Sequence, residues 1–487
     1  MHQHQRPHGR PHLRVALATA TAAALTGGLL SFAAAPAPAA DSTYVPQADF
    51  NGDGYRDVAV GAMGADVGSV QNAGAVVVLY GSSTGVSATR KTVITQNSTG
   101  VPGAAEEGDR FGYSLAAADL NGDKYADLVV GSQYEAIGDR EGVGTATVIW
   151  GGSSGLSGGA ALPQPSPSEL NEWGGYGSAV ATGDFDGDGK PDVTVTGQNH
   201  IHLYRGPFTR TGTGELGGAY EVTAGDLTGD GDAERVYPYL VDGDPGGAVP
   251  YYTYDPGNWD AHPESDYALV DLPNADGEEA VIADVNGDTY GDLVLGDYQD
   301  PRADKPGGHK GGQITVWYGG PNGPDPAQKP TVIHQDTTGV PGAGETDDVF
   351  GSALSAGDVN GDGYADIAVG AWGEDLGSVK DAGSVTLLFG SASGLTGTGA
   401  RSYSQDTAGV PGSSEYMDAF GMTVRLVDLD KNGRADLVTG AGYENGYGAV
   451  TVLRAASSGL TTSGAKFISA RDAGIKGGGE FAWAIAQ

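Results

Sequence analysis

The chain has 487 residues, with 62 acidic against 26 basic side chains, and a formal net charge of −36. An acid excess of this size argues against DNA, RNA or an anionic lipid surface as the partner. The chain has no cysteine, so disulfide bonds play no part in its stability.

The first 40 residues have the pattern of a secretory signal peptide. Arg6, Arg10 and Arg14 give a basic start, the apolar stretch Val15–Leu30 follows, and Ala37-Pro38-Ala39 supplies a small-residue cleavage site. An uncleaved membrane anchor is the alternative. No later apolar run approaches the ~20 residues that span a bilayer. We therefore expect a secreted, extracellular protein without a membrane span.

A nine-residue motif recurs seven times in the rest of the chain. Oxygen-bearing side chains stand at its positions 1, 3, 5 and 9, and glycine stands at position 4 or 6, where a tight loop needs positive φ. The first half of an EF-hand loop binds Ca²⁺ in this way, with a backbone carbonyl at position 7. The copies are DFNGDGYRD (Asp49–Asp57), DLNGDKYAD (Asp119–Asp127), DFDGDGKPD (Asp184–Asp192), DLTGDGDAE (Asp226–Glu234), DVNGDTYGD (Asp284–Asp292), DVNGDGYAD (Asp358–Asp366) and DLDKNGRAD (Asp428–Asp436).

The motif predicts up to seven Ca²⁺ sites, and a set of metal-free Asx-turns is the alternative. The alternative does not explain why position 9 is acidic in every copy. The candidate ligands are the residues at positions 1, 3, 5, 7 and 9 of each copy. In chain order they are Asp49, Asn51, Asp53, Tyr55, Asp57, Asp119, Asn121, Asp123, Tyr125, Asp127, Asp184, Asp186, Asp188, Lys190, Asp192, Asp226, Thr228, Asp230, Asp232, Glu234, Asp284, Asn286, Asp288, Tyr290, Asp292, Asp358, Asn360, Asp362, Tyr364, Asp366, Asp428, Asp430, Asn432, Arg434 and Asp436.

Short apolar runs surround each motif and predict strands rather than the helices of an EF-hand. An aromatic-glycine start and a first strand come before the motif, as in FGYSLAAAD (Phe111–Asp119). A second strand such as LVVG follows the motif at once, and a third such as AVVVLYG comes after a variable loop. A turn such as GSSTG then leads to a fourth strand, KTVITQ.

Four strands in each of seven repeats predict an all-β fold: a seven-bladed β-propeller of four-stranded antiparallel blades over residues 41–487. The residues before Asp49 lack the aromatic-glycine start of a first strand. Phe481–Gln487, which begins Phe-Ala, supplies the missing first strand at the other end, with Phe481 aligned on Phe111 and Ile485 on Leu115. We therefore expect the C-terminal strand to close the ring as the innermost strand of the first blade.

The fourth repeat is irregular, because Arg235–Tyr254 is rich in tyrosine and Asp255–Asp266 is polar. It is interpreted either as a degenerate blade or as a binding insertion.

A second motif, GVPG followed by a glutamate, an aspartate and a phenylalanine, recurs at identical offsets. The glutamate and aspartate are Glu106 and Asp109, Glu345 and Asp348, and Glu415 and Asp418. This loop joins the fourth strand of one blade to the first strand of the next, on the face opposite the calcium motifs. Its carboxylates either cap the turn or form an acidic rim for a basic or polyhydroxyl ligand.

The combination of Phe-Gly, calcium loop and Gly-Ala resembles the FG-GAP repeat. That repeat builds the N-terminal propeller of integrin α subunits and occurs in secreted bacterial proteins. The family's proline is missing, since Met63, Trp372 and Gly442 stand in its place, and integrin propellers bind calcium in only some blades. The motif pairs are Phe111-Gly112, Phe350-Gly351, Phe420-Gly421, Gly61-Ala62, Gly370-Ala371 and Gly440-Ala441.

The resemblance implies a platform for cell adhesion or ligand binding. We expect a secreted, monomeric, calcium-binding module for a protein or glycan ligand. A secreted hydrolase or lyase that acts on polysaccharide is the alternative. The sequence favours binding over catalysis, and it assigns no catalytic and no cofactor-binding residue.

Overall fold

A computed structural model describes residues 48–164, 173–198, 200–206, 208, 212–216, 222–238, 248–254, 267–273, 275–301, 307–477 and 480–486. These residues form seven four-stranded antiparallel sheets, which we number as blades by the order of their calcium motifs. The predicted signal peptide and the segment Asp255–Asp266 lie outside the described residues.

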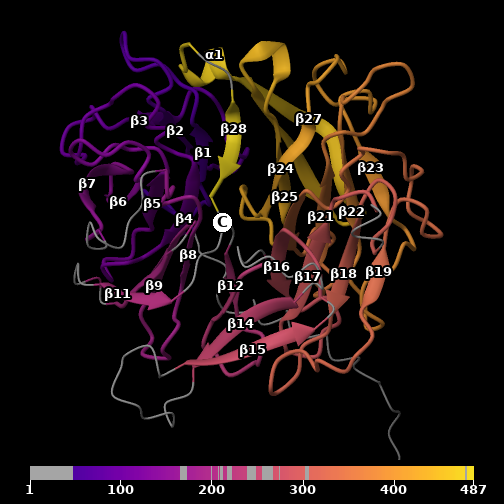
Figure 1. Ribbon diagram of the computed structural model, residues 1–487. Helices are drawn as coiled ribbons and strands as arrows, with labels where there is room; N and C mark the ends of the chain where they lie inside the picture. The colour runs from indigo at the N-terminus through magenta and orange to yellow at the C-terminus, as the bar shows by residue number, and fades with distance from the viewer. Residues whose placement is uncertain are drawn as a thin grey trace, which may run out of the picture. The chain divides into compact units, whose positions relative to one another are not determined.

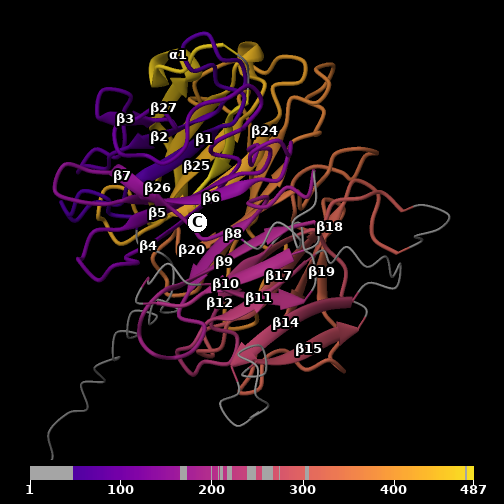
Figure 2. The ribbon, with the colours of Figure 1, turned by 60° about the vertical axis from the view of Figure 1, so that its left-hand side comes forward.

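The strands follow the predicted order, with the first strand of each blade at one edge of its sheet. Figure 2 labels all four strands of one such sheet, from the first strand β4 to the fourth strand β7. The first blade contains β28 (Phe481–Ile485), β1 (Val58–Ala62), β2 (Ala75–Leu79) and β3 (Lys91–Ile94). The second contains β4 (Ser114–Ala118), β5 (Asp127–Ser132), β6 (Thr145–Trp150) and β7 (Ser157–Ala161). The third contains β8 (Val180–Gly183), β9 (Asp192–Gly197), β10 (His200–Tyr204) and β11 (Gly212–Leu216).

The other four blades have the same order. The fourth blade contains β12 (Thr223–Gly225), β13 (Glu234–Val236), β14 (Ala248–Tyr254) and β15 (Tyr267–Pro273), and the fifth contains β16 (Glu279–Ala283), β17 (Asp292–Asp297), β18 (Gln313–Trp317) and β19 (Thr331–Ile333). The sixth contains β20 (Ala353–Gly357), β21 (Asp366–Ala371), β22 (Ser384–Leu388) and β23 (Arg401–Tyr403). The seventh contains β24 (Phe420–Val427), β25 (Asp436–Ala441), β26 (Ala449–Ala456) and β27 (Gly459–Ser469). A 3₁₀ turn, η2 (Glu444–Gly446), and one short helix, α1 (Ala470–Ala473), complete the described elements.

The first strands form a closed cycle of contacts, which makes the seven sheets a propeller. Each one packs against the next in the order β28, β4, β8, β12, β16, β20, β24 and back to β28. In Figure 1 the first strands that carry labels, β28, β4, β8, β12, β16 and β24, surround the centre of the view. The second strands are buried along their whole length, as in β5, β21 and β25, because neighbouring blades cover both of their faces.

The C-terminal strand closes the ring as predicted. β28 pairs antiparallel with β1, with Val60 opposite Ile485 and Ala62 opposite Phe481. The two strands lie side by side in Figure 1, yellow beside indigo, although they come from opposite ends of the chain. Phe481 is fully buried, like its counterpart Phe111. The aligned aromatic side chains therefore serve the same packing role in the two blades.

The fourth repeat forms a four-stranded blade with shortened inner strands. Its inner strands β12 and β13 have only three residues each, yet Arg235 pairs with Tyr252 and Val236 with Tyr251 in the ordinary antiparallel register. Tyr251, Tyr252 and Tyr254 of the tyrosine-rich stretch therefore lie in strand β14, whereas Tyr237 directly follows β13. The interpretation of Asp255–Asp266 as a binding insertion concerns residues outside those that the structure describes.

Candidate functional site

Each of the seven motifs leads directly into the second strand of its blade, and in all blades but the first it joins the first strand to the second, so the antiparallel order places the motifs on one face. Neighbouring motifs are also bonded to each other. The backbone N–H of Ala126 donates to the carbonyl of Asp49 at 3.0 Å, and that of Ala435 to the carbonyl of Asp358 at 2.8 Å. The loops therefore form a connected rim rather than independent tips.

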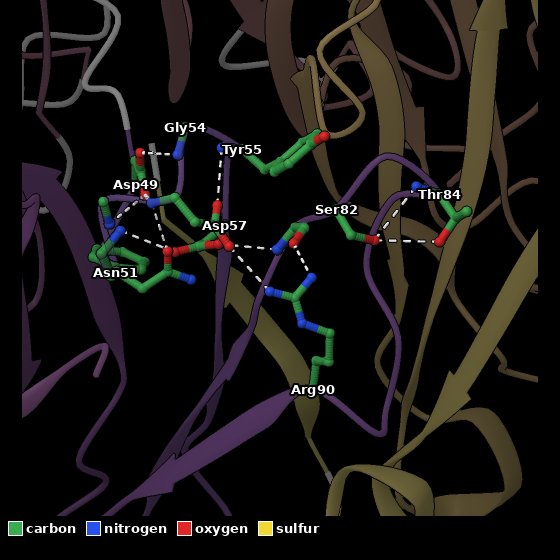
Figure 3. A network of polar contacts seen from close by, with 12 residues as sticks. Asp49, Asn51, Gly54, Tyr55, Asp57, Ser82, Thr84 and Arg90 are labelled. Carbon is green, nitrogen blue, oxygen red and sulfur yellow. Dashed lines mark hydrogen bonds and ion pairs between the residues drawn. The ribbon is translucent and has the colours of Figure 1, made fainter. Parts of the chain in front are cut away.

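The side chains of the first motif fold back over their own backbone (Figure 3). Asp49 accepts from the backbone N–H of Gly52 at 2.7 Å through Oδ1 and from that of Gly54 at 2.8 Å through Oδ2. Asn51 Oδ1 accepts from the N–H of Asp53 at 2.8 Å. Gly52 and Gly54 have φ of +71° and +84°, which confirms the predicted left-handed turn. These bonds hold the oxygen atoms at the inner side of a tight loop.

The donor set fits a hard cation. Asp184, Asp186 and Asp188 each offer a carboxylate oxygen, and these atoms all lie within 4.8 Å of one another. Asp186 Oδ1 and Thr228 Oγ1, at position 3 of the third and fourth motifs, are buried and accept no hydrogen bond within the described part of the chain. Crowded carboxylates repel one another, and oxygen atoms without donors are what Ca²⁺ coordinates.

The acidic residue at position 9 has a second role that the sequence pattern did not reveal. Asp57 is buried, and its Oδ2 accepts from the N–H of Phe50 at 2.9 Å while its Oδ1 accepts from the N–H of Gly81 at 2.9 Å. The same two bonds recur at Asp127, Asp192, Asp292 and Asp366. Position 9 therefore ties the motif to the turn between the third and fourth strands.

These hydrogen bonds correct the interpretation of position 9. Metal-free turns also account for an acidic residue there, so that position alone does not favour calcium. A carboxylate has about four lone-pair sites, so the two hydrogen bonds leave acceptor capacity for a cation.

Burial raises the pKa of these position-9 carboxyl groups, and the other carboxylates of the motif raise it further. The pKa of Asp57 rises to about 7 through burial, with smaller contributions from the charges of Asp49 and Asp53. The pKa of Glu234 rises to about 8 and that of Asp436 to about 6, in both cases chiefly through burial. A bound cation has the opposite effect, because it favours the ionised form.

Basic side chains approach three of the motifs. Arg90 Nη2 lies 3.0 Å from Asp53 Oδ2, and Arg205 Nε lies 3.8 Å from Asp186 Oδ2. Arg454, at the end of β26, pairs with Asp430. Arg205 follows the third strand of its blade, Arg454 lies near the end of another third strand, and Arg90 directly precedes the fourth strand β3. The motif itself therefore carries no signal of these partners.

Position 2 of the motif is a buried apolar anchor, and it is apolar in all seven copies of the sequence. Its side chain packs into the core between blades, with at most 2% exposed. The seven residues are Phe50, Leu120, Phe185, Leu227, Val285, Val359 and Leu429.

A central cavity of about 620 Å³ is lined by the first strands of all seven blades. Aromatic side chains line it at the end remote from the calcium motifs, where first strands begin and second strands end. We call Tyr113, Tyr298, Trp372, Tyr443 and Trp483 the channel mouth. The rings of Tyr113 and Trp483 lie 5.8 Å apart. A cavity of this size with aromatic walls is suited to a ligand that offers flat or apolar faces.

In each GVPG loop one carboxylate caps the turn and a second one is exposed. Asp109 is buried, and its Oδ2 accepts from the backbone N–H of Glu106 at 2.6 Å, so it caps the turn. Asp348 and Asp418 make the same bond at 2.6 Å. The side chain of Glu106 is exposed, as are those at the equivalent positions of the two other loops.

Comparison with known proteins agrees with this architecture. FG-GAP repeats match residues 45–79, 111–149, 350–388 and 420–453, and an FG-GAP-like repeat matches 184–237. Mouse integrin alpha-IIb is 35% identical over 192 residues, which are 37% of this chain and 16% of that protein. Human integrin alpha-8 is 31% identical over 240 residues, 48% of this chain and 20% of that protein.

Mouse phosphatidylinositol-glycan-specific phospholipase D is 32% identical over 164 residues, 34% of this chain and 18% of that protein. The chain thus spans about a fifth or less of the length of these relatives. Among the described residues, none of the helices has the length and apolar character needed to cross a membrane. With its repeats and its ring of seven blades, the chain is an FG-GAP repeat protein that resembles the N-terminal propeller of integrin α subunits.

Proposed function

We propose that the protein is a secreted, calcium-binding propeller that binds an extracellular protein or glycan at the channel mouth, as an adhesion module. The observation that carries the ligand site is the group of five aromatic side chains around one end of a cavity of about 620 Å³. Tyr and Trp are enriched where proteins bind partners, because each buries a large area at little entropic cost.

The two faces of the propeller have separate roles in this proposal. Calcium in the motifs fixes one face, and the mouth on the other binds the ligand. Exposed Glu106, Glu345 and Glu415 surround this second face with negative charge, which favours a basic or polyhydroxyl ligand over an anionic one. The large negative net charge of the chain also disfavours an anionic ligand.

A binding screen tests the ligand site. The secreted protein is applied to a glycan array and to extracellular proteins in the presence of calcium. Trp372→Ala and Tyr443→Ala should each weaken binding at least tenfold. Tyr416→Ala is the matched control, because Tyr416 is an exposed aromatic residue that follows a GVPG loop without lining the cavity. Equal affinity in all four proteins would place the ligand elsewhere.

The same panel tests the polysaccharide-degrading alternative. Product formation from a polysaccharide, measured as new reducing ends or unsaturated sugars, supports an enzyme. Binding without product supports the adhesion module.

A further inference from the structure

A second group of buried polar side chains recurs three times on the face opposite the calcium motifs. In each copy a glutamine after the fourth strand of one blade contacts a glutamate after the second strand of the next. Gln96 Nε2 donates to Glu135 Oε2 at 2.5 Å, and Gln405 Nε2 donates to Glu444 Oε2 at 2.5 Å. Gln335 donates in the same way to Glu374. The two partners are 39 residues apart in every copy.

Each copy also contains the buried aspartate of the GVPG loop. Asp109 is 2% exposed, as are Asp348 and Asp418. Burial and then the charge of Asp109 raise the pKa of Glu135 to about 7. In the other copies Asp348 and Asp418 act on Glu374 and Glu444 in the same sense. The aspartate and the glutamate of each copy therefore lie close enough for their charges to interact, and the charges that act on Glu135 are negative.

The glutamine oxygen is the feature that points to a ligand. Gln96, Gln335 and Gln405 are only 3–4% exposed, and the Oε1 atom of each is buried with no hydrogen-bond donor in the described chain. Buried polar atoms in native proteins almost always have a partner. The same orphan oxygen in three independent copies therefore indicates a common missing partner.

The interface between the seventh and the first blades lacks the group. Counted from the Gly-Ala end of the second strand, the position of Glu135 is occupied by Ala65 in the first blade. The loop that precedes this blade, after β27, lacks the GVPG motif. All three residues are thus absent from this interface, whereas the second blade has a glutamine in the corresponding place, Gln164, whose Nε2 donates to the carbonyl of Gly144 at 2.9 Å instead.

We propose that each of these Gln–Glu–Asp groups, which we call blade latches, binds one hard divalent cation between two blades. The donors are an amide carbonyl oxygen and carboxylate oxygens, without nitrogen or sulfur, which suits Ca²⁺ rather than Zn²⁺. A cation supplies the partner for the orphan oxygen and offsets the repulsion between the two acids. The latches join the first blade to the second, the fifth to the sixth and the sixth to the seventh.

Bound calcium, counted by equilibrium dialysis with radioactive Ca²⁺ at pH 8, tests the latches. The triple variant Glu135→Gln, Glu374→Gln and Glu444→Gln should bind three ions fewer than the wild type. The matched control is Glu106→Gln, Glu345→Gln and Glu415→Gln, which removes the same charge from exposed positions near the latches and should bind as many ions as the wild type.

An unchanged count in the latch variant overturns the proposal and indicates that the carboxyl pairs are protonated or hydrated. If the triple variant does not fold, Glu374→Gln alone should lose one ion, and an unchanged count there has the same meaning. The test compares the number of ions bound by two proteins, the latch variant and the wild type, which have identical calcium motifs. Failure of the motifs to bind calcium would therefore lower both counts equally and leave the difference of three.

Discussion

Asp57 Oδ1 accepts a hydrogen bond from the backbone N–H of Gly81 at 2.9 Å, although the two residues are 24 apart in the chain. Its other oxygen accepts from Phe50, within the same motif. One buried carboxylate thus connects the motif that precedes the second strand to the turn between the third and fourth strands. This bond links the candidate calcium site to the rest of the blade whether or not a cation is present.

Asp57→Ala should destabilise the protein both with calcium and with chelator. The change leaves two buried N–H groups unpaired, at roughly 1–3 kcal/mol each. Asp53→Ala is the contrasting variant, since its pair with Arg90 is partly exposed and contributes little. We expect it to lower the melting temperature only when calcium is present. Equal calcium dependence of the two variants would show that position 9 acts solely through the metal.

The seven sites should differ in affinity. The third motif brings three carboxylates within 4.8 Å of one another, whereas the fourth has Thr228 at position 3 and lies in the blade with shortened inner strands. We expect the third site to be among the tightest and the fourth the weakest, although Lys190 Nζ pairs with Asp188 at 2.5 Å in the third. Calcium titration calorimetry of Asp188→Ala and Asp230→Ala measures the order. A larger loss of tight binding for Asp230→Ala would reverse it.

Deletion of Phe481–Gln487 should abolish cooperative folding or cause aggregation. It removes β28, exposes the inner edge of β1 and uncovers apolar side chains around the cavity. Size-exclusion chromatography and a melting curve measure the effect. A truncated protein that stays monomeric and melts within a degree or two of the full chain would mean that another segment closes the ring. The alternative segment, Thr43–Ala48, lies outside the described residues except for Ala48.

A histidine pair should make stability depend on pH. The rings of His309 and His334 stack with centroids 3.5 Å apart, and His309 Nε2 lies 3.3 Å from Asp336 Oδ2. Burial and the neighbouring His309 lower the pKa of His334 below 6.5, while Asp336 opposes this shift. The unfolded chain therefore takes up a proton more readily, and the stability present above pH 6.5 is lost as the pH falls below it.

His334→Phe keeps an aromatic ring in the stack but removes the titration. Between pH 7.5 and pH 5.5 its melting temperature should fall less than that of the wild type. Parallel pH profiles of the two proteins would show that protonation of His334 costs no stability.

The repeats and the closed ring were predictable because each blade carries the same local signals. The alignment of Phe481 on Phe111 needed only the aromatic residue and the apolar residues that follow it, and the pairing of β28 with β1 confirms it. The ligand positions in the calcium motifs stay a prediction, because a loop bonded as that of Asp49 also forms without a cation.

Contacts between blades were not predictable from one repeat at a time. Gln96 and Glu135 belong to different blades, and only the packing of the blades brings them together. Arg454 pairs with Asp430 because β26 ends beside the motif. No pattern within either segment indicates that contact, whereas the buried position 2 was visible as an apolar residue in all seven copies.

A melting curve of the mature protein, recorded in calcium and again in excess chelator, tests the calcium account most directly. Cations that bind the native state stabilise it by mass action, and each motif crowds carboxylates that repel one another without a cation. We predict that chelation lowers the melting temperature by many degrees and that added calcium restores it. A melting temperature that chelator leaves unchanged would contradict the account and favour metal-free turns held by the position-9 carboxylates.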